Sequence, residues 1–373
     1  MSEFSQLDYR FMGKALYLAE QGKFTAHPNP MVGCVIAKND EIIGEGWHRA
    51  PGQPHAEVHA LKAAADRAQG ATAYVTLEPC CHHGRTGPCA EALIEAGIAR
   101  VVCAVEDPFP AVAGQGIALL KQAGLDVSVG LLASQAEKLN RGFMARHLTA
   151  KPYVCCKMAM SLDGRTAAAD GSSQWITSAQ ARQDVQLLRA QSGAIMTGIG
   201  TVLHDNPSLT VRSDIGDLRG LVGQAYFQQP KRVVIDSQFR LPADAKMLSL
   251  DGETWVYTLA SVAAPDKANI KVIQGEALNG RVDLNHVVRS LARQDVNSVL
   301  VEAGPTLSGA MLAAGLLDEL VIYIAPKLLG DAGKGLFNLP ALKNISQQIP
   351  LEISDIRSVG TDFKITATPK MRD

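Results

Sequence analysis

The chain has 373 residues, 47% of them hydrophobic and 20% charged, which is ordinary for a folded protein and long enough for two hydrophobic cores. Lys and Arg number 36 against 37 Asp and Glu, so the basic excess of a protein that binds duplex nucleic acid is missing. The N-terminal segment resembles no signal peptide and no run of about 18 apolar residues occurs, so we expect a cytoplasmic protein without a membrane span.

Helical and strand periodicities alternate through the first 149 residues. We expect helices at 7–22, 54–68, 88–97 and 134–148, a hairpin at 31–48 that turns at Asn39-Asp40, and strands at 73–77, 100–106 and 124–130. Pro54 and Pro88 each stand at a helix entrance. The alternation predicts a three-layer α/β/α domain over residues 1–149.

The pattern restarts near residue 150. We expect strands at 154–162, 231–237, 253–259, 270–274, 298–304, 319–326, 352–358 and 362–368, and helices at 178–192, 283–294 and 305–315. The stretch 212–230 is polar and rich in turn residues, so we interpret it as a surface excursion. Residues 150–373 are therefore predicted to form a second α/β domain.

Two short segments, PHAE (54–57) and TLEPCCHHGRTGPC (76–89), together predict a catalytic zinc site. A catalytic zinc ion takes three protein ligands and keeps one open position, and His55, Cys80 and Cys89 supply such a set. Bound zinc lowers the pKa of water from about 15.7 toward roughly 7, which provides a nucleophile at neutral pH. An odd number of cysteines, seven, without an export signal argues against a disulfide framework.

Glu57 is the predicted proton carrier of this site, because zinc deaminases pair a His-x-Glu with two cysteines and use the Glu as general acid and base. Residues i and i+2 do not share a helix face, so His55 and Glu57 can converge only if the metal lies off the helix end. Cys81, His82 and His83 are alternative ligands. A fourth ligand among them would favour a structural zinc protein instead of an enzyme.

Eight residues separate Cys80 from Cys89, whereas the usual deaminase signature has two. With this insert the chain resembles the bifunctional deaminase–reductase family of bacterial riboflavin biosynthesis, whose pattern PCSHHGRTPPC corresponds here to PCCHHGRTGPC (79–89). The two sequences differ at Cys81 and Gly87. The resemblance continues through HPNPMVGCVI (27–36), KMAMSLDGRTA (157–167), TVLHDNPSLTVR (201–212) and VEAGPTLSGAML (301–312), and covers nearly the whole chain.

The resemblance implies a cytidine-deaminase-like first domain and a second domain similar to dihydrofolate reductase. The first would deaminate 2,5-diamino-6-(5-phosphoribosylamino)pyrimidin-4(3H)-one, and the second would reduce the ribosyl group of the product with NADPH. Carried over by motif, the expected NADPH contacts are Ala159, Trp175, Thr201, Asp205, Ser237 and the turn Gly304, Pro305, Thr306, Leu307, Ser308, Gly309 and Ala310. The expected substrate contacts are Ser173, Arg189, Leu209, Arg212 and Glu302.

Taken alone, the residues of the second half are less specific. No G-x-G-x-x-G or P-loop spacing occurs, and the best candidate for a phosphate site is the glycine turn before Pro305. Arg189 and Arg212 could grip a phosphate bidentately. Lys157 and Glu302 could relay a proton to the sugar, or could form a structural ion pair.

In the first half, Asn29 and His48 are further candidates for contacts with the substrate ring, and His82, His83 and Arg85 lie in the insert beside them. The alternative function is a deaminase of another nucleobase or of tRNA with a non-catalytic second domain. Near-neutral charge, the insert and the intact second half count against it. We expect small-molecule phosphoribosylaminopyrimidine substrates, neither nucleic acid nor membrane as partner, and self-association into a homo-oligomer as an open expectation.

Overall fold

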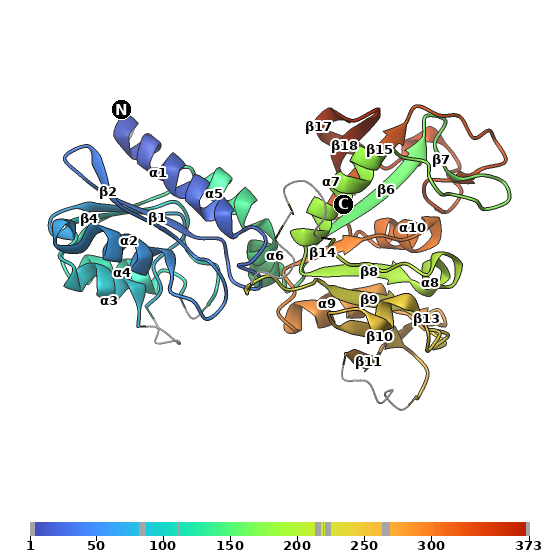
Figure 1. Ribbon diagram of the computed structural model, residues 1–373, viewed down its shortest axis with the longest axis horizontal. Helices are drawn as coiled ribbons and strands as arrows, with labels where there is room; N and C mark the ends of the chain where they lie inside the picture. The colour runs from blue at the N-terminus through green and yellow to red at the C-terminus, as the bar shows by residue number, and fades with distance from the viewer. Residues whose placement is uncertain are drawn as a thin grey trace. The chain divides into compact units, whose positions relative to one another are not determined.

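The computed structural model describes residues 4–81, 87–110, 112–212, 218, 220, 225–262 and 269–370, and the predicted excursion 212–230 lies largely outside them. The chain folds into two compact units, residues 1–150 and 151–373, each with its own sheet. Figure 1 shows the two units, the first in blue to green and the second in green to red. Within the described residues, no helix has the length and apolar character needed to cross a membrane.

The first unit is a sheet between two layers of helices. Its helices are α1 (Gln6–Ala19), η1 (Glu20–Gly22), α2 (Ala56–Ala64), η2 (Ala65–Ala68), α3 (Cys89–Glu95), α4 (Gln115–Gln122), α5 (Ala133–Leu139) and α6 (Arg141–Thr149). Its strands are β1 (Gly33–Lys38), β2 (Glu41–Trp47), β3 (Thr72–Val75), β4 (Arg100–Cys103) and β5 (Asp126–Val129), in the order β2-β1-β3-β4-β5.

Two hydrophobic clusters hold these layers together. Alanines of α2 and leucines of α3 and α4 pack on one face of the sheet, and α1 and α5 pack on the other. Figure 1 shows these helices on the two faces. The hairpin β1–β2 is antiparallel and turns at Asn39 and Asp40, both with positive φ, while β3, β4 and β5 run parallel. The predicted three-layer α/β/α architecture and the predicted hairpin are therefore confirmed.

Two features of this unit differ from the prediction. The helix expected at 134–148 is broken into α5 and α6, because Asn140 has non-helical dihedral angles and exchanges two hydrogen bonds, both 2.8 Å, with the backbone of Met31. Helix α4 was not predicted. It begins at Gly114, so the Ser, Thr or Asp that usually marks a helix start is missing from the sequence there.

The second unit is built on a nine-stranded sheet with helices on both faces. Its strands are β6 (Tyr153–Ser161), β7 (Arg165–Ala167), β8 (Ala194–Gly198), β9 (Lys231–Ile235), β10 (Thr254–Thr258), β11 (Ile270–Gln274), β12 (Ala277–Leu278), β13 (Arg281–Val282), β14 (Ser298–Val301), β15 (Glu319–Ala325), β16 (Lys334–Gly335), β17 (Leu351–Val359) and β18 (Asp362–Pro369). Its helices are α7 (Ala179–Ala190), α8 (Ile199–Asp205), η4 (Lys246–Ser249), α9 (Leu284–Arg293), α10 (Pro305–Ala313) and η5 (Ile345–Gln347).

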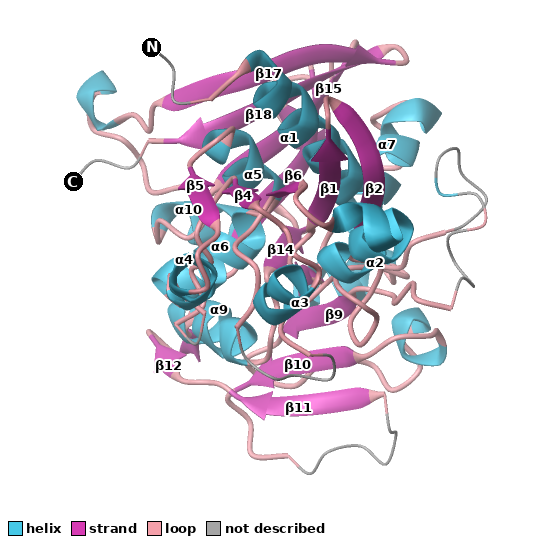
Figure 2. Cartoon of the chain, turned by 90° about the vertical axis from the view of Figure 1, so that its left-hand side faces the viewer, coloured by secondary structure: helices cyan, strands magenta, loops and turns pink. Residues whose placement is uncertain are grey.

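The strand order is β11-β10-β9-β8-β14-β6-β15-β18-β17 in the main sheet. The strands from β11 to β15 are parallel, and β18 and β17 continue the sheet as an antiparallel hairpin. Figure 2 shows β11 and β17 as the two edges. Helices α9 and α10 pack on one face, and α7 and α8 pack on the other. The predicted second α/β domain is confirmed, although α8 and the short strands β7, β12, β13 and β16 were not predicted.

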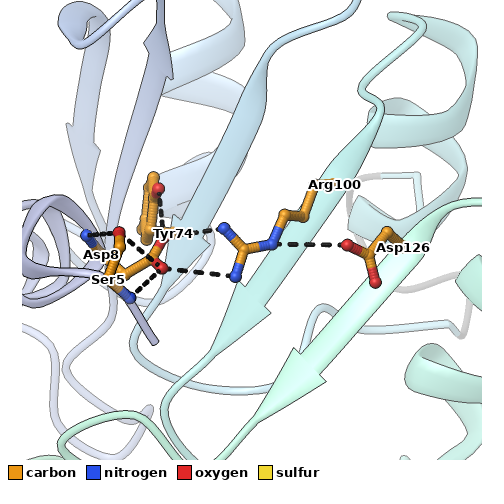
Figure 3. A network of polar contacts seen from close by, with 5 residues as sticks. All are labelled: Ser5, Asp8, Tyr74, Arg100 and Asp126. Carbon is orange, nitrogen blue, oxygen red and sulfur yellow. Dashed lines mark hydrogen bonds and ion pairs between the residues drawn. The ribbon is translucent and has the colours of Figure 1, made fainter. Parts of the chain in front are cut away.

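A buried carboxylate ties α1 to the sheet of the first unit (Figure 3). Asp8 accepts hydrogen bonds from the backbone and hydroxyl of Ser5, which completes a capping box at the start of α1. It also accepts bonds of 2.7 Å from the Tyr74 hydroxyl and 2.8 Å from Arg100, which in turn contacts Asp126. Burial alone would raise the pKa of Asp8, but bonds from Arg100, Ser5 and Tyr74 outweigh it and lower the pKa to about 2.

We predict that Asp8 makes the first unit sensitive to acid. Because its pKa is lower in the folded than in the unfolded chain, it contributes about 2–3 kcal/mol of stability at neutral pH. That contribution is present above about pH 4, is about half lost by pH 3, and disappears as the pH falls through about 2. Urea unfolding curves of the wild type and Asp8→Asn at pH 7 and pH 3 should therefore converge at the lower pH. A stability difference that does not change with pH would contradict this account.

Candidate metal centre and sheet-edge site

Three predicted ligands converge in the first unit. His55 is the N-cap of α2, Cys89 is the first residue of α3, and Cys80 lies in the loop that follows β3. The His55 Nδ1 atom lies 3.3 Å from the Cys89 sulfur and 3.6 Å from the Cys80 sulfur, and all three donor atoms lie within 4.8 Å of one another. Tetrahedral zinc with ordinary Zn–S and Zn–N bonds separates its ligand atoms by about 3.6 Å. The donor set therefore fits zinc in both chemistry and spacing.

The hydrogen bonds between the two cysteines favour thiolate at Cys80. The backbone N–H of Cys89, at the start of α3, donates to the Cys80 sulfur at 3.3 Å. The thiol of Cys89 and then His55 lower the pKa of Cys80 to about 4, although burial opposes them. The same contact with Cys80, together with burial, raises the pKa of Cys89. Thiolate is the form that binds metal, and a helix N-terminus stabilises it.

Glu57 lies at the same place and keeps one free oxygen. Its side chain is 3% exposed, it contacts Cys89, and its Oε2 atom has no hydrogen-bond partner among the described residues. Burial raises the pKa of Glu57, while the charge of His55 opposes the rise. His55 has extended rather than helical dihedral angles, so it points off the end of α2. This resolves the expected difficulty of bringing residues i and i+2 to one point.

The structure also places Asn29 and His48 beside this centre. The His48 ring packs edge-on against His55 with ring centroids 5.4 Å apart, and its Nε2 atom lies 3.0 Å from the Asn29 amide nitrogen. Its Nδ1 atom faces the Pro54 carbonyl at 3.4 Å. Burial, followed by the neighbouring His55, lowers the pKa of His48 to about 4, so the ring is neutral at physiological pH. A neutral ring that donates a hydrogen bond from Nδ1 to the Pro54 carbonyl accepts a hydrogen bond from the Asn29 amide at Nε2.

The alternative ligands do not join this set in the part of the chain that the structure describes. Cys81 is absent from the group of converging donors, and burial raises its pKa, which disfavours thiolate. His82, His83 and Arg85 lie outside the described residues. Three protein ligands plus one buried carboxylate is the arrangement of a catalytic rather than a structural zinc site.

In the second unit, the predicted cofactor residues gather at one edge of the parallel sheet. Ala159 lies near the end of β6, Thr201 follows β8, Ser237 follows β9 and Gly304 follows β14. These strands are neighbours in the order β9-β8-β14-β6 and run parallel, so their carboxyl ends share one edge. Ligands of open α/β sheets bind at this edge.

Helix α10 begins at this edge, with Gly304 as its N-cap and Pro305 as its first residue. The predicted turn Gly304, Pro305, Thr306, Leu307, Ser308, Gly309 and Ala310 therefore forms its first turns, where free backbone N–H groups favour a phosphate. Asp205 ends α8 and contacts His204. Trp175 is 63% exposed under the guanidinium of Arg182.

The predicted substrate residues do not all offer free side chains. Leu209 is 3% exposed and packs in a core cluster with Ile199 and Val202, so only its backbone could face a ligand. Ser173 is half-buried and Arg212 is exposed. That Arg189 binds the substrate stays a prediction, and in the structure its side chain contacts Glu302.

Arg189 and Glu302 form a buried bidentate pair. Arg189 Nε and Nη2 donate to the two carboxylate oxygens of Glu302 at 2.5 and 2.9 Å, and Nη1 donates to the Thr210 carbonyl. All three guanidinium nitrogens are thus engaged inside the protein. Lys157 stands one position past the β14–β6 register pair Val301–Cys156, beside Glu302. Burial lowers the pKa of Lys157 against the opposing charge of Glu302.

Sequence reasoning missed one residue of the first unit. Glu78, two positions before Cys80, is 4% exposed and accepts backbone hydrogen bonds from three residues in the segment 107–117. Its only sequence signal is its place in the motif LEPC (77–80).

Comparison with known proteins agrees with this geometry. Residues 5–105 match the family model described as the cytidine and deoxycytidylate deaminase zinc-binding region, and residues 152–365 match the RibD C-terminal domain. The riboflavin biosynthesis protein RibD of Escherichia coli is 52% identical over 95% of this chain and 97% of its own. The RibD of Haemophilus influenzae is 46% identical over 99% of this chain and all of its own. The chain belongs to the RibD family.

Solved RibD structures have the same fold. Acinetobacter baumannii RibD superimposes with a TM-score of 0.90 at 43% identity, covering 98% of this chain and 99% of its own. The deaminase/reductase of Thermotoga maritima gives a TM-score of 0.86 at 31% identity with the same coverage. The chain is thus a bifunctional enzyme of riboflavin biosynthesis with a zinc-binding deaminase domain and a reductase domain. The expectation of a riboflavin deaminase–reductase is confirmed over that of a lone deaminase.

We predict that the Arg189–Glu302 pair stabilises the second unit only while it is complete. Arg189→Ala should cost about 3–5 kcal/mol in urea unfolding, because it leaves the Glu302 carboxylate buried without a partner. Replacing both residues, as in Arg189→Met with Glu302→Leu, should recover most of that loss. A cost below about 1 kcal/mol for the single change would show that water or Lys157 compensates the charge.

Proposed function

We propose that the first domain, residues 1–149, deaminates 2,5-diamino-6-(5-phosphoribosylamino)pyrimidin-4(3H)-one. The second domain, residues 150–373, then reduces the ribosyl side chain of 5-amino-6-(5-phosphoribosylamino)uracil to ribityl with NADPH. The observation that carries the proposal is the convergence of His55, Cys80 and Cys89 on buried Glu57. The Thermotoga maritima relative supports the substrates, since it is named a diaminohydroxyphosphoribosylaminopyrimidine deaminase and 5-amino-6-(5-phosphoribosylamino)uracil reductase.

In the first domain, His55, Cys80 and Cys89 hold zinc and Glu57 carries protons. Zinc, when bound, supplies an activated water and a Lewis acid. The free Oε2 of Glu57 would hold a proton beside the metal and deliver protons to the ring nitrogen and to the departing amine. Water thus replaces the exocyclic amino group, which leaves as ammonia. The Asn29–His48 pair contacts the pyrimidine ring, and the neutral His48 adds no charge to repel the metal.

In the second domain, the carboxyl edge of the sheet would hold NADPH. The first turn of α10 would bind its phosphates, and Ala159, Trp175, Thr201, Asp205 and Ser237 would supply the further contacts. Addition of hydride at the sugar C1 breaks the bond between C1 and the ring oxygen, and that oxygen takes up one proton to become a hydroxyl group. Lys157 supplies that proton, since burial favours its neutral form and so eases proton release. Arg189 has a different role, because it holds Glu302 in place for the substrate.

We assign the substrate phosphate to Arg212 together with Arg189, whose guanidinium has two N–H groups beyond the three that bind Glu302 and Thr210. Ser173 and the backbone of Leu209 complete the substrate contacts. We place the enzyme in the cytoplasm, where a reducing environment keeps the cysteine ligands as thiols. Its partners are small molecules, with neither nucleic acid nor membrane.

We expect that Glu57→Gln separates the two activities. In an assay with the zinc-loaded protein and the diaminopyrimidinone ribosyl phosphate, ammonia release should fall at least about 100-fold. Zinc content and NADPH oxidation with the deaminated uracil should stay unchanged. Wild-type protein that holds zinc but releases no ammonia would overturn the substrate assignment and favour another nucleobase.

Lys157→Ala should have the opposite effect. Ammonia release should continue, NADPH should still bind, and NADPH oxidation followed by the nicotinamide absorbance should fall at least about 100-fold. An unchanged oxidation rate would remove Lys157 from the mechanism and leave it as a structural partner of Glu302.

We propose that the chain self-associates along the edge strand β17. This strand ends the sheet in Figure 2, and the hairpin face that it shares with β18 exposes Leu351, Ile353, Ile356 and Phe363 at 44, 53, 59 and 52%. A long exposed apolar edge strand is a template for pairing with another chain. Two copies paired antiparallel about Ile356 place Asp355 of each opposite Arg357 of the other, so the edge is self-complementary in charge.

Ile356→Asp should therefore shift the chain from a dimer to a monomer of 39.7 kDa in size-exclusion chromatography with light scattering. Leu278→Asp is the matched control, since Leu278 is 55% exposed on β12 and away from this edge. A monomeric wild type, or equal behaviour of the two variants, would reject the β17 interface.

A further inference from the structure

A buried carboxylate stands directly behind the metal centre. Glu78 is 4% exposed, and its Oε2 atom accepts the backbone N–H groups of Asp107 at 3.1 Å and Gly114 at 2.9 Å. Its Oε1 atom accepts the N–H of Ile117 at 3.1 Å. No ion pair of Glu78 occurs in the described part of the chain. Backbone N–H groups therefore provide the stabilisation that a buried carboxylate requires.

These bonds make Glu78 the cap of α4. The first N–H groups of a helix lack partners inside the helix, and a side chain at the N-cap usually accepts one of them. Gly114 is the N-cap of α4 and has no side chain to do so. Glu78 comes from 36 residues away and accepts the N–H groups of both Gly114 and Ile117. Its negative charge is also favourable at this end of the helix.

A second contact fixes the residue between Glu78 and Cys80. An added Cβ at Gly116, in the first turn of α4, would lie 2.0 Å from the carbonyl oxygen of Pro79. Only glycine allows this approach, so the backbone of Pro79 lies directly against the helix. The next residue, Cys80, accepts the N–H of Cys89 at its sulfur and the N–H of Ala90 at its carbonyl.

We propose that Glu78 is a positioning residue of the zinc site. Through Pro79, its bonds to α4 hold the backbone of Cys80 at the place where the sulfur meets His55 and Cys89. This inference rests on the proposed zinc ligands. It adds that the geometry of the zinc site depends on α4, although α4 contributes no ligand among the described residues. Glu78 acts through Cys80 and touches neither substrate nor the reacting atoms.

The test compares Glu78→Gln with Asp8→Asn in the full-length zinc-loaded protein. The amide of Gln keeps the size of the side chain but turns an N–H group toward the donors of Gly114 or Asp107, so at least one bond is lost. Asp8 is the matched control, because it is also a buried carboxylate that caps a helix of this unit, yet its partners are Ser5, Tyr74 and Arg100. Both changes destabilise the unit, and only Glu78→Gln should disturb the metal.

Zinc release to a chromogenic chelator should be about 10- to 100-fold faster in Glu78→Gln than in the wild type, and unchanged in Asp8→Asn. The visible absorption of the Co²⁺-substituted protein should shift in Glu78→Gln alone, because it reports the geometry of the thiolate ligands. NADPH oxidation with the deaminated uracil shows that the second unit is intact, and urea unfolding curves show whether the first unit is folded. Glu78→Asp, which keeps the charge with a shorter reach, should fall between wild type and Gln and serves if Gln does not fold.

Equal zinc release from Glu78→Gln and Asp8→Asn, or an unaltered Co²⁺ spectrum, would reduce Glu78 to a stabilising residue and overturn the proposal. Cys80→Ser separates this result from a failure of the metal site itself. If Cys80→Ser releases zinc as slowly as the wild type, Cys80 is not a ligand and the ligand assignment is wrong. If Cys80→Ser loses zinc while Glu78→Gln keeps it, only the role of Glu78 is rejected.

Discussion

The first unit depends on bringing two sulfur atoms and one imidazole nitrogen to within bonding distance of a single point. The fold achieves this by starting two helices there, so that His55 precedes α2 and Cys89 opens α3. Helix N-termini suit this task because their free N–H groups and dipoles favour thiolate over thiol. Cys80 comes from a loop and has no helix of its own, which explains why that loop is held by so many backbone bonds.

Four buried carboxylates of this protein differ in whether both of their oxygens accept hydrogen bonds. Asp8, Glu78 and Glu302 each have donors for both oxygens, and each holds two distant segments together. Glu57 alone among these four keeps an oxygen without a donor. An unsatisfied buried polar atom costs free energy, so the fold maintains it against its own stability. Of these four carboxylates, the one with an incomplete set of hydrogen bonds is the one for which we propose proton exchange with a substrate.

Predictions from the sequence succeeded where the information is local. His55, Glu57, Cys80 and Cys89 lie in two short motifs, and turn residues such as Asn39 and Asp40 mark the hairpin directly. Contacts between distant segments could not be predicted: Arg189 and Glu302 are 113 residues apart, and only the structure shows that they pair. Helix α4 escaped prediction for a related reason, because its capping group is supplied by Glu78 from another part of the chain.

The strand order of the second unit has a consequence for how the chain folds. Strand β6 is the first strand of its sheet in sequence, yet both of its neighbours, β14 and β15, lie more than 130 residues later. Pairing of such distant strands is slow, because a long loop must close before any contact is gained. The first unit is complete at residue 150, whereas β6 cannot pair until most of the remaining chain has been synthesised. During synthesis, the deaminase half can therefore be folded while the core strand of the reductase half is still unpaired.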